Sequence, residues 1–384
     1  MQEPWVTAHA VAQFEAVKYI SAPPAGTTMC CELPVVFDVC RLRVVLCERY
    51  ATEPILYQRA VLCVGGKNHT LTFSGREEAL VLPGQEVVSD AIEAMVRARE
   101  TLTLWLCHAG EAGARSVTVL PAKYSGKGDF CGEAFPPPAF FEKKRAEKLN
   151  ACGYARIEAE PVSEACAVAA FGDSITSMGL WVNPLAKKLT ESGNVALLNM
   201  GIGGNRLLYD TSIPFLKTTQ LFGRAALTRF SWDVAALPGV CAVFVALGVN
   251  DISQPGGKKR WSPNGAERCT TESLIAGFEK LLALCAEKGL KTVGCTITPF
   301  GGYLTYNDST ARIRNEANDW ILNGGAFNMT VDFASAVCDP KKPDFMLSAF
   351  DSGDHLHPSP AGGQKMAEAV DLEALKALLK EETP

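Results

Sequence analysis

Three polar residues, one near the middle of the chain and two near its end, have the side chains that acyl transfer to a serine requires. Ser174 follows an apolar run and Gly172, and it precedes a segment with helical spacing. A serine on a strand-to-helix turn has its hydroxyl near the positive end of a helix, where backbone N–H groups can stabilise negative charge on oxygen. Taken alone, Ser174 could equally be the N-cap of that helix.

A carboxylate and an imidazole lie three residues apart near the end of the chain. In one turn of helix-like backbone, Asp354 and His357 face the same way. The carboxylate could then fix the tautomer of the imidazole and stabilise its charged form, which is what a base for Ser174 needs. The neighbouring His355 points away from Asp354 in such a turn, and we expect it at the rim of the site.

Two more segments contribute groups suited to an anion. The stretch from Asn199 to Arg206 is rich in glycine, so its backbone can approach a ligand closely, and it matches neither common phosphate-binding glycine pattern. The stretch from Gly248 to Asp251 carries Asn250, whose amide can donate a hydrogen bond to a developing oxyanion.

The hydrophobic pattern predicts the elements that would bring these groups together. Five apolar strands alternate with helical stretches, which implies one parallel sheet covered by helices on both faces. The strands are expected at 165–171, 195–200, 241–247, 291–297 and 329–333, and the helices at 181–192, 216–230, 268–288, 309–322 and 360–380. Ligands bind at the carboxyl ends of such strands, and the polar segments follow the first three.

The N-terminal part has a different pattern. Between Val35 and Leu120 short strands alternate with turns, and Gly65-Gly66-Lys67-Asn68 is a strong hairpin signal. This pattern predicts a β-sandwich. We therefore expect an N-terminal β-sandwich domain at 1–124, a connector at 125–164 and an α/β domain at 165–384.

Composition limits the class of protein and of partner. The chain of 384 residues is 47% apolar and 21% charged, with a net charge of -5, which argues against nucleic acid or an anionic membrane as a partner. Many of its 14 cysteines lie in apolar runs, and no C-x-x-C pair occurs. They read as reduced thiols. With no signal-peptide pattern at the start, we expect a cytoplasmic protein, or a secreted one if a signal was removed.

Four blocks of the sequence resemble the SGNH (GDSL) hydrolase superfamily. They are Gly172-Asp173-Ser174, Gly204, Gly248-x-Asn250-Asp251 and Asp354-x-x-His357. The resemblance implies a flavodoxin-like α/β hydrolase domain. Longer stretches resemble a branch of esterases and acylhydrolases with an N-terminal β-rich domain, so the likeness extends over nearly the whole chain.

The resemblance also implies a role for each block. Ser174 would be the nucleophile, His357 the general base and Asp354 the residue that orients His357. The N–H groups of Ser174 and Gly204, with the Asn250 side chain, would form the oxyanion hole.

Four further residues are candidate substrate contacts. Phe300 and Tyr303 follow the fourth strand and could line the acyl or leaving-group side. Arg206 could contact a polar substrate or brace its loop, and Asp173 adjoins the nucleophile.

These observations predict a serine esterase that needs no cofactor or metal. The expected substrate is a small acyl ester, acetyl foremost, on a sugar or oligosaccharide, cleaved through an acyl-enzyme. The first alternative is a lysophospholipase or arylesterase of the same superfamily. An acyltransferase and a non-catalytic carbohydrate-binding protein are further alternatives, and the oligomeric state is left open.

Overall fold

The computed structural model describes residues 4–16, 26–109, 115–134, 149–210, 222–255 and 267–381. The chain forms two compact units. One consists of Met1–Cys166 with Gly193–Ala196, and the other of Ala167–Ser192 with Leu197–Pro384.

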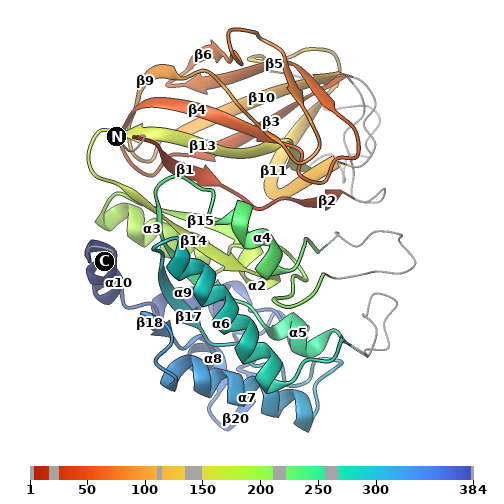
Figure 1. The fold of residues 1–384 in the computed structure, drawn as a ribbon, viewed down its shortest axis with the longest axis vertical. Helices are drawn as coiled ribbons and strands as arrows, with labels where there is room; N and C mark the ends of the chain where they lie inside the picture. The colour runs from red at the N-terminus through yellow and green to blue at the C-terminus, as the bar shows by residue number, and fades with distance from the viewer. Residues whose placement is uncertain are drawn as a thin grey trace. The chain divides into compact units, whose positions relative to one another are not determined.

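Two antiparallel sheets make up the first unit (Figure 1). One has the order β1-β13-β4-β8, with β9 also paired to β4; the other has the order β12-β11-β3-β10-β5-β6, with β2 on β11 and β7 on β5. The strands are Val6–Ala10 (β1), Phe14–Ala16 (β2), Thr27–Pro34 (β3), Val39–Cys47 (β4), Ile55–Val64 (β5), Lys67–Thr70 (β6), Ala79–Val81 (β7), Glu86–Val88 (β8), Ile92–Val96 (β9), Thr101–Ala109 (β10), Arg115–Lys127 (β11), Leu149–Cys152 (β12) and Tyr154–Pro161 (β13). The predicted N-terminal β-sandwich is confirmed.

Local sequence explains the clearest of these strands. In β10 every second residue is apolar, and Leu102, Leu104 and Leu106 are buried in the core. The predicted hairpin turn joins β5 to β6. Gly65 and Gly66 both have left-handed φ angles, 55° and 80°, which a two-residue turn of this kind requires.

Part of the expected connector at 125–164 is instead sheet. Strand β12 pairs with β11, and β13 lies between β1 and β4. Strand β13 is hard to recognise from sequence because two charged side chains lie buried within it. Arg156 and Glu158 are 6% and 1% exposed and form an ion pair of 2.7 Å, so the strand lacks a plain apolar alternation. The run of prolines and charges at 136–145 lies outside the described residues.

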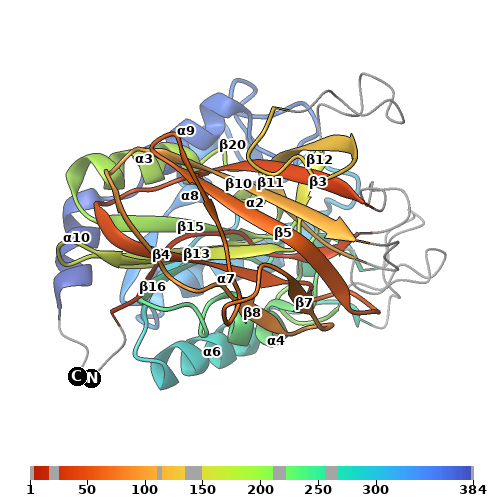
Figure 2. The same ribbon diagram turned by 90° about the horizontal axis from the view of Figure 1, so that it is seen from above.

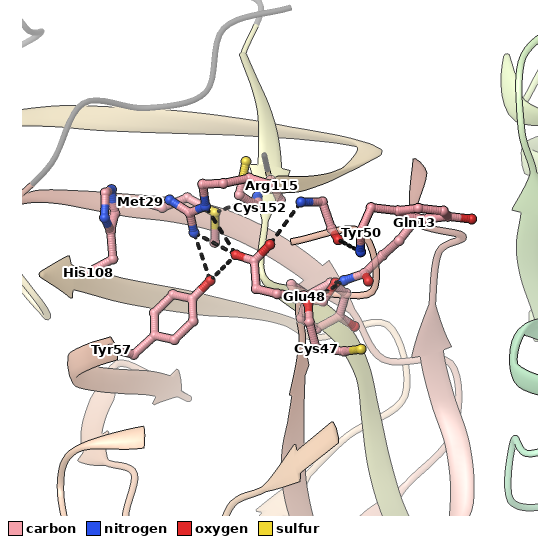
Figure 3. A network of polar contacts seen from close by, with 12 residues as sticks. Gln13, Met29, Cys47, Glu48, Tyr50, Tyr57, His108, Arg115 and Cys152 are labelled. Atoms are coloured by element: carbon pink, nitrogen blue, oxygen red, sulfur yellow. Dashed lines mark hydrogen bonds and ion pairs between the residues drawn. The ribbon is translucent and has the colours of Figure 1, made fainter. Parts of the chain in front are cut away.

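A buried polar network joins the two sheets of the first unit (Figure 3). Glu48, which follows β4, accepts hydrogen bonds from the Tyr57 hydroxyl at 2.7 Å and from Arg115 Nη2 at 2.7 Å. Its other carboxylate oxygen accepts from the Ser116 N–H at 2.8 Å. Because a buried charge is costly unless paired and hydrogen-bonded, this network fixes how β4, β5 and β11 lie together.

The second unit contains the predicted five-stranded parallel sheet, in the order β15-β14-β16-β17-β18. Figure 2 shows helices α3 and α9 on one side of it and α4 and α6 on the other. The strands are Cys166–Gly172 (β14), Val195–Gly201 (β15), Val240–Ala246 (β16), Lys291–Cys295 (β17) and Met329–Val331 (β18), and a small hairpin, Cys338–Asp339 (β19) with Lys342–Met346 (β20), follows. The helices are Ser174–Ser177 (α2), Val182–Ser192 (α3), Ala226–Asp233 (α4), Val249–Ser253 (α5), Thr271–Glu287 (α6), Asp308–Asn323 (α7), Phe333–Val337 (α8), Pro360–Glu368 (α9) and Leu372–Lys380 (α10).

Two predicted helices differ from the structure. The helix expected at 360–380 is divided into α9 and α10, because Asp371 caps a new helix by accepting the N–H groups of Glu373 and Ala374. The helix expected at 216–230 corresponds to α4, which runs from Ala226 to Asp233; the first part of the expected range, 216–221, lies outside the described residues.

Trp181 anchors α3 to the sheet as a core residue. It is fully buried, and its ring lies 5.7 Å from that of Phe244 in β16 and 5.1 Å from that of Phe333 in α8. All fourteen cysteines fall within the described residues, and none of them forms a disulfide there. Among the described helices, none has the length and apolar content to span a bilayer.

Candidate active site

The turn after β14 presents Ser174 to solvent. Ser174 is the first residue of α2 and is half-buried. Asp173 caps this short helix, since its carboxylate accepts the N–H of Ile175 at 3.0 Å. Glycine is needed at Gly201, at the end of β15, because a Cβ there would overlap the backbone nitrogen of Ser177. The first two strand ends are thus packed backbone to backbone.

The structure brings the three predicted triad residues together. His357 Nε2 lies 2.8 Å from Ser174 Oγ, and His357 Nδ1 lies 2.6 Å from Asp354 Oδ2. The His357 side chain is 23% exposed and that of Asp354 is 48% exposed. The serine hydroxyl, the imidazole and the carboxylate therefore form one continuous hydrogen-bonded chain that solvent can reach.

The backbone around this pair is not the helical turn that the spacing suggested. Residues 351–358 form a loop closed by a bridge between Asp351 and Pro358. Asp354 Oδ1 accepts the N–H groups of Leu356 and His357 at 3.0 and 2.9 Å. The carboxylate that holds the imidazole therefore also holds the loop.

These hydrogen bonds decide the charge on Asp354. Burial by itself would raise the pKa of this carboxyl. The bonds from the His357 backbone and ring and from the Leu356 N–H outweigh burial, so the pKa lies below its ordinary value of 3.8. Asp354 is ionised at neutral pH and can stabilise a protonated His357.

His355 has a carboxylate partner of its own. Its Nδ1 lies 2.6 Å from Asp351 Oδ2, its side chain is 52% exposed, and its φ is 63°. The ring of His355 therefore pairs with Asp351, whereas that of His357 pairs with Asp354.

A loop from 201 to 208 carries Gly204, which was predicted to supply an oxyanion donor. Gly204 has a left-handed φ of 72°, and a Cβ there would meet the ring of Phe222 at 2.7 Å. Asp251 holds the far end of the loop, accepting the N–H groups of Leu207 and Leu208 at 2.8 and 3.0 Å. The loop is fixed by side chains from the third strand end.

Asn250 lies in α5, next to that loop. Its Nδ2 donates to the carbonyl of Asn205 at 3.1 Å, and its Oδ1 accepts from Gln254 Nε2 at 2.8 Å. An amide nitrogen has two hydrogens, so one donor remains for a ligand. Gln254 Nε2 also donates to the carbonyl of Gly204 at 2.8 Å.

Sequence reasoning missed Arg229 in α4. Its buried guanidinium donates to the carbonyls of Gly172 and Met200 at 2.8 and 2.9 Å and to Asn205 Oδ1 at 2.9 Å. One side chain thus ties the ends of β14 and β15 to the loop. No pattern in the sequence distinguishes this arginine from a solvated helical one. Gln254 could have been found, because it stands four residues after Asn250 on one helical face.

The four candidate substrate contacts take different places. Arg206 is fully buried and donates to Glu267 Oε2 and to the carbonyl of Asp210, at 2.6 and 2.7 Å, so it braces its loop. The structure differs from expectation at Phe300, whose ring is 1% exposed and packs against Tyr306. Tyr303 is half-buried; burial, and then the charge of Asp354, raise its pKa. Tyr303 thus lies near the triad.

Asp173, the fourth of these contacts, is buried beside a small cavity. The cavity has a volume of about 20 Å³, and Thr296, Thr298, Phe333 and Met366 are among the residues that line it. Burial raises the pKa of Asp173 to about 7, against the hydrogen bond from Ile175. Among the residues that the structure describes, no group of three or more His, Cys, Asp or Glu side chains could hold a metal ion.

The family model described as GDSL-like Lipase/Acylhydrolase matches residues 168–370. The chain belongs to this family and is a carboxylic ester hydrolase. The match covers the second unit from β14 to the end of α9, and it contains every residue of the site described above.

Three of the solved structures that resemble this protein each align with a little over half of the chain. They are a GDSL-like lipase from Bacteroides thetaiotaomicron (17% identity, 57% of this chain and 92% of that one, TM-score 0.40), an acetylxylan esterase from Geobacillus stearothermophilus (17%, 58% and 97%, 0.40) and an aryl esterase from M. smegmatis (15%, 56% and 98%, 0.41). Likenesses of this size assign no substrate. The comparison with curated proteins gives no match.

Proposed function

We propose that this chain is a serine esterase that removes small acyl groups, acetyl foremost, from a carbohydrate through a Ser-His-Asp triad. The observation that carries the triad is the hydrogen-bonded chain from Ser174 through His357 to Asp354, with contacts of 2.8 and 2.6 Å. In this geometry one imidazole nitrogen faces the hydroxyl and the other faces an ionised carboxylate.

The reaction proceeds in two steps. His357 Nε2 takes the proton of Ser174 Oγ, and Oγ attacks the ester carbonyl carbon. The oxyanion that forms is held by the N–H groups of Ser174 and Gly204 and by Asn250 Nδ2. His357 returns the proton to the leaving alcohol, and the acyl group stays on Ser174. Water, activated by His357 in the same way, then releases the acid.

The preference for a small acyl group is taken from the branch of esterases and acylhydrolases that the sequence resembles. The cavity of about 20 Å³ beneath the nucleophile turn is lined by Asp173 and Ile175 and by no residue of the triad, so it says nothing about the size of the acyl group. Phe300 is buried against Tyr306 and offers no apolar wall to a long acyl group. The burial of Phe300 is therefore the one structural observation that supports acetyl or a similarly short acyl group.

An arylesterase is the second candidate, favoured by exposed apolar side chains on the segments that carry the site. Met178 ends the nucleophile helix, Tyr209 extends the glycine-rich loop, and Leu304 lies in the loop beside His355; they are 47%, 43% and 71% exposed. Such side chains suit an aromatic leaving group better than a sugar.

The cytoplasmic location and the absence of nucleic-acid and membrane partners stay predictions.

One experiment tests both the triad and the substrate class. Turnover is measured on nitrophenyl esters from acetyl to long chain, on aryl acetates and on acetylated oligosaccharides, for the wild type and for Ser174→Ala. We expect short chains and acetylated sugars to be the best substrates. Ser174→Ala should lower the rate on the order of 10⁵- to 10⁶-fold with the fold intact.

A fluorophosphonate should label the wild type at Ser174 and leave Ser174→Ala unlabelled. Full activity in the alanine variant would contradict the triad, and a preference for long chains or plain aryl esters would contradict the carbohydrate substrate. Adding a sugar acceptor and analysing products separates hydrolysis from acyl transfer.

A further inference from the structure

We propose that Gln254 is a positioning residue that orients two of the three oxyanion donors, the Asn250 amide and the Gly204 N–H. This inference rests on the proposed function. Its basis is one side-chain amide group, Gln254 Nε2, which donates to Asn250 Oδ1 and to the Gly204 carbonyl, each at 2.8 Å.

Two contacts set the orientation of the Asn250 amide, and Gln254 makes the one at its oxygen. The two ends of an asparagine amide have almost the same shape, so hydrogen-bond partners decide which end faces a ligand. The Gly204 carbonyl can only accept, which obliges Gln254 to present its NH₂ group there. The second hydrogen of that NH₂ group is donated to Asn250 Oδ1. The Asn250 nitrogen is therefore on the side of its amide that faces away from Gln254. At that nitrogen, the Asn205 carbonyl agrees with this orientation, accepting at 3.1 Å.

The same contact restrains Gly204. Gly204 has a left-handed φ of 72°, and glycine adopts positive and negative φ about equally well, so the residue itself does little to hold this conformation. The hydrogen bond from Gln254 to the Gly204 carbonyl fixes the peptide plane that follows Gly204. The Gly204 N–H belongs to the preceding peptide plane, and its direction relative to the fixed plane is set by the backbone angles of Gly204. A preorganised donor is worth more to an oxyanion than one that must first be turned.

The position of Gln254 in the sequence makes the arrangement compact. Gln254 is the C-cap of α5 and stands four residues after Asn250, so both side chains emerge on one face of the helix. Between them, Asp251 holds the N–H groups of Leu207 and Leu208. The same short helix therefore carries an oxyanion donor, its brace and the clamp on the loop that supplies another donor.

Two substitutions distinguish a wrongly oriented Asn250 amide from the mere loss of the Gln254 hydrogen bonds. Gln254→Glu keeps the shape but replaces the donor with oxygens that face two other oxygens, and Gln254→Met keeps the length without any polar atom. We expect kcat/KM on a nitrophenyl acetate to fall roughly 10²- to 10³-fold in Gln254→Glu, as for the loss of an oxyanion donor, and less in Gln254→Met. The loss should lie in kcat, with KM little changed.

The matched control is Gln364→Glu in α9. Gln364 is exposed and also donates to an oxygen four residues away, that of Glu368, at 3.0 Å. The same exchange there should leave kcat and KM unchanged. A trifluoromethyl ketone, which forms an anionic adduct with the serine, should bind more weakly to Gln254→Glu by the factor that kcat/KM has lost. Thermal unfolding checks that every variant is folded.

A double-mutant cycle with Asn250→Ala gives the decisive result. If Gln254 acts through Asn250, the loss caused by Gln254→Glu should be at least tenfold smaller in the Asn250→Ala background. An equal loss in both backgrounds, a loss confined to KM, or wild-type kcat in Gln254→Glu would overturn this inference. Ser174→Ala, assayed alongside, keeps the two proposals apart: its full activity contradicts the triad, whatever Gln254 does.

Discussion

At the scale of single residues, the loop from 351 to 358 contains two carboxylate–histidine pairs with different surroundings. His355 pairs with Asp351, and its side chain is about half exposed. His357 pairs with Asp354, is less exposed, and reaches Ser174 with its other nitrogen. Only the second pair is connected to the nucleophile, and this difference leads to a prediction.

His357→Ala should lower kcat/KM nearly as much as Ser174→Ala does, on the order of 10⁵- to 10⁶-fold, because nucleophile and base act as one unit. His355→Ala should retain most activity. The measurement is steady-state turnover of a nitrophenyl acetate over a range of pH. The fall in kcat/KM at acid pH, which arises when the base is protonated, should persist in His355→Ala.

The matched comparison is internal, since the two substitutions are identical and two residues apart. An inactive His355→Ala with an active His357→Ala would reverse the assignment of the base. Comparable losses in both would mean that the Asp351–His355 pair supports the loop that carries His357. Thermal unfolding of both variants separates this effect from general destabilisation.

At the scale of elements, the site depends on how closely the strand ends meet. Arg229 bonds the carbonyls that end β14 and β15, and Gly201 lets the end of β15 approach the turn that carries Ser174. A Cβ at Gly201 would overlap the backbone nitrogen of Ser177, and no change of side-chain rotamer can relieve a contact with the backbone. A Cβ at the nearby Gly203, by contrast, would meet nothing within 4 Å.

Gly201→Ala should therefore displace β15 from the nucleophile turn, while Gly203→Ala should be nearly silent. We expect Gly201→Ala to lose about 1 to 3 kcal/mol of unfolding free energy through overpacking. Its kcat/KM should fall about 10²-fold, since a displacement near 1 Å in a catalytic group has that effect. Denaturant unfolding and turnover of both variants test this, and equal behaviour of the two would contradict it.

How far the sequence could predict these elements depended on the kind of signal. The parallel strands were found because strands buried on both faces read as apolar runs, as Ala167 to Phe171 does. Strand β13 was missed because Arg156 and Glu158 neutralise each other inside it. The triad was found because its spacing has a chemical reason. The bracing by Arg229 was not, because it joins segments that only the fold brings together.

At the scale of the whole molecule, the two units bury charge in different ways. In the first unit the Glu48 carboxylate is paired with Arg115 and accepts two further hydrogen bonds, from the Tyr57 hydroxyl and the Ser116 N–H. In the second unit Asp173 has one hydrogen bond from the Ile175 N–H and lies fully buried. Burial raises its pKa from 3.8 to about 7. The charged groups that act on it are His357, Asp251 and Arg229.

This raised pKa links the stability of the second unit to pH. Below pH 4 the Asp173 carboxyl is neutral in both the folded and the unfolded chain. Between pH 4 and 7 the unfolded chain releases the proton while the folded protein keeps it, so the free energy of unfolding falls as the pH rises. Above pH 7 the folded protein bears the full cost of a buried carboxylate, at most roughly 4 kcal/mol for a pKa rise of this size.

Asp173→Asn should remove this dependence. Asparagine keeps the oxygen that caps α2 but carries no charge, so relative to the wild type the variant should gain stability between pH 4 and pH 8. The measurement is urea unfolding at both pH values, with hydrogen exchange of the peptides around β14 to assign the transition to the second unit. Asp371→Asn, the same exchange at the exposed cap of α10, controls for the loss of one negative charge. A stability difference between Asp173→Asn and the wild type that is the same at pH 4 and pH 8 would show that Asp173 does not stay protonated in the folded protein.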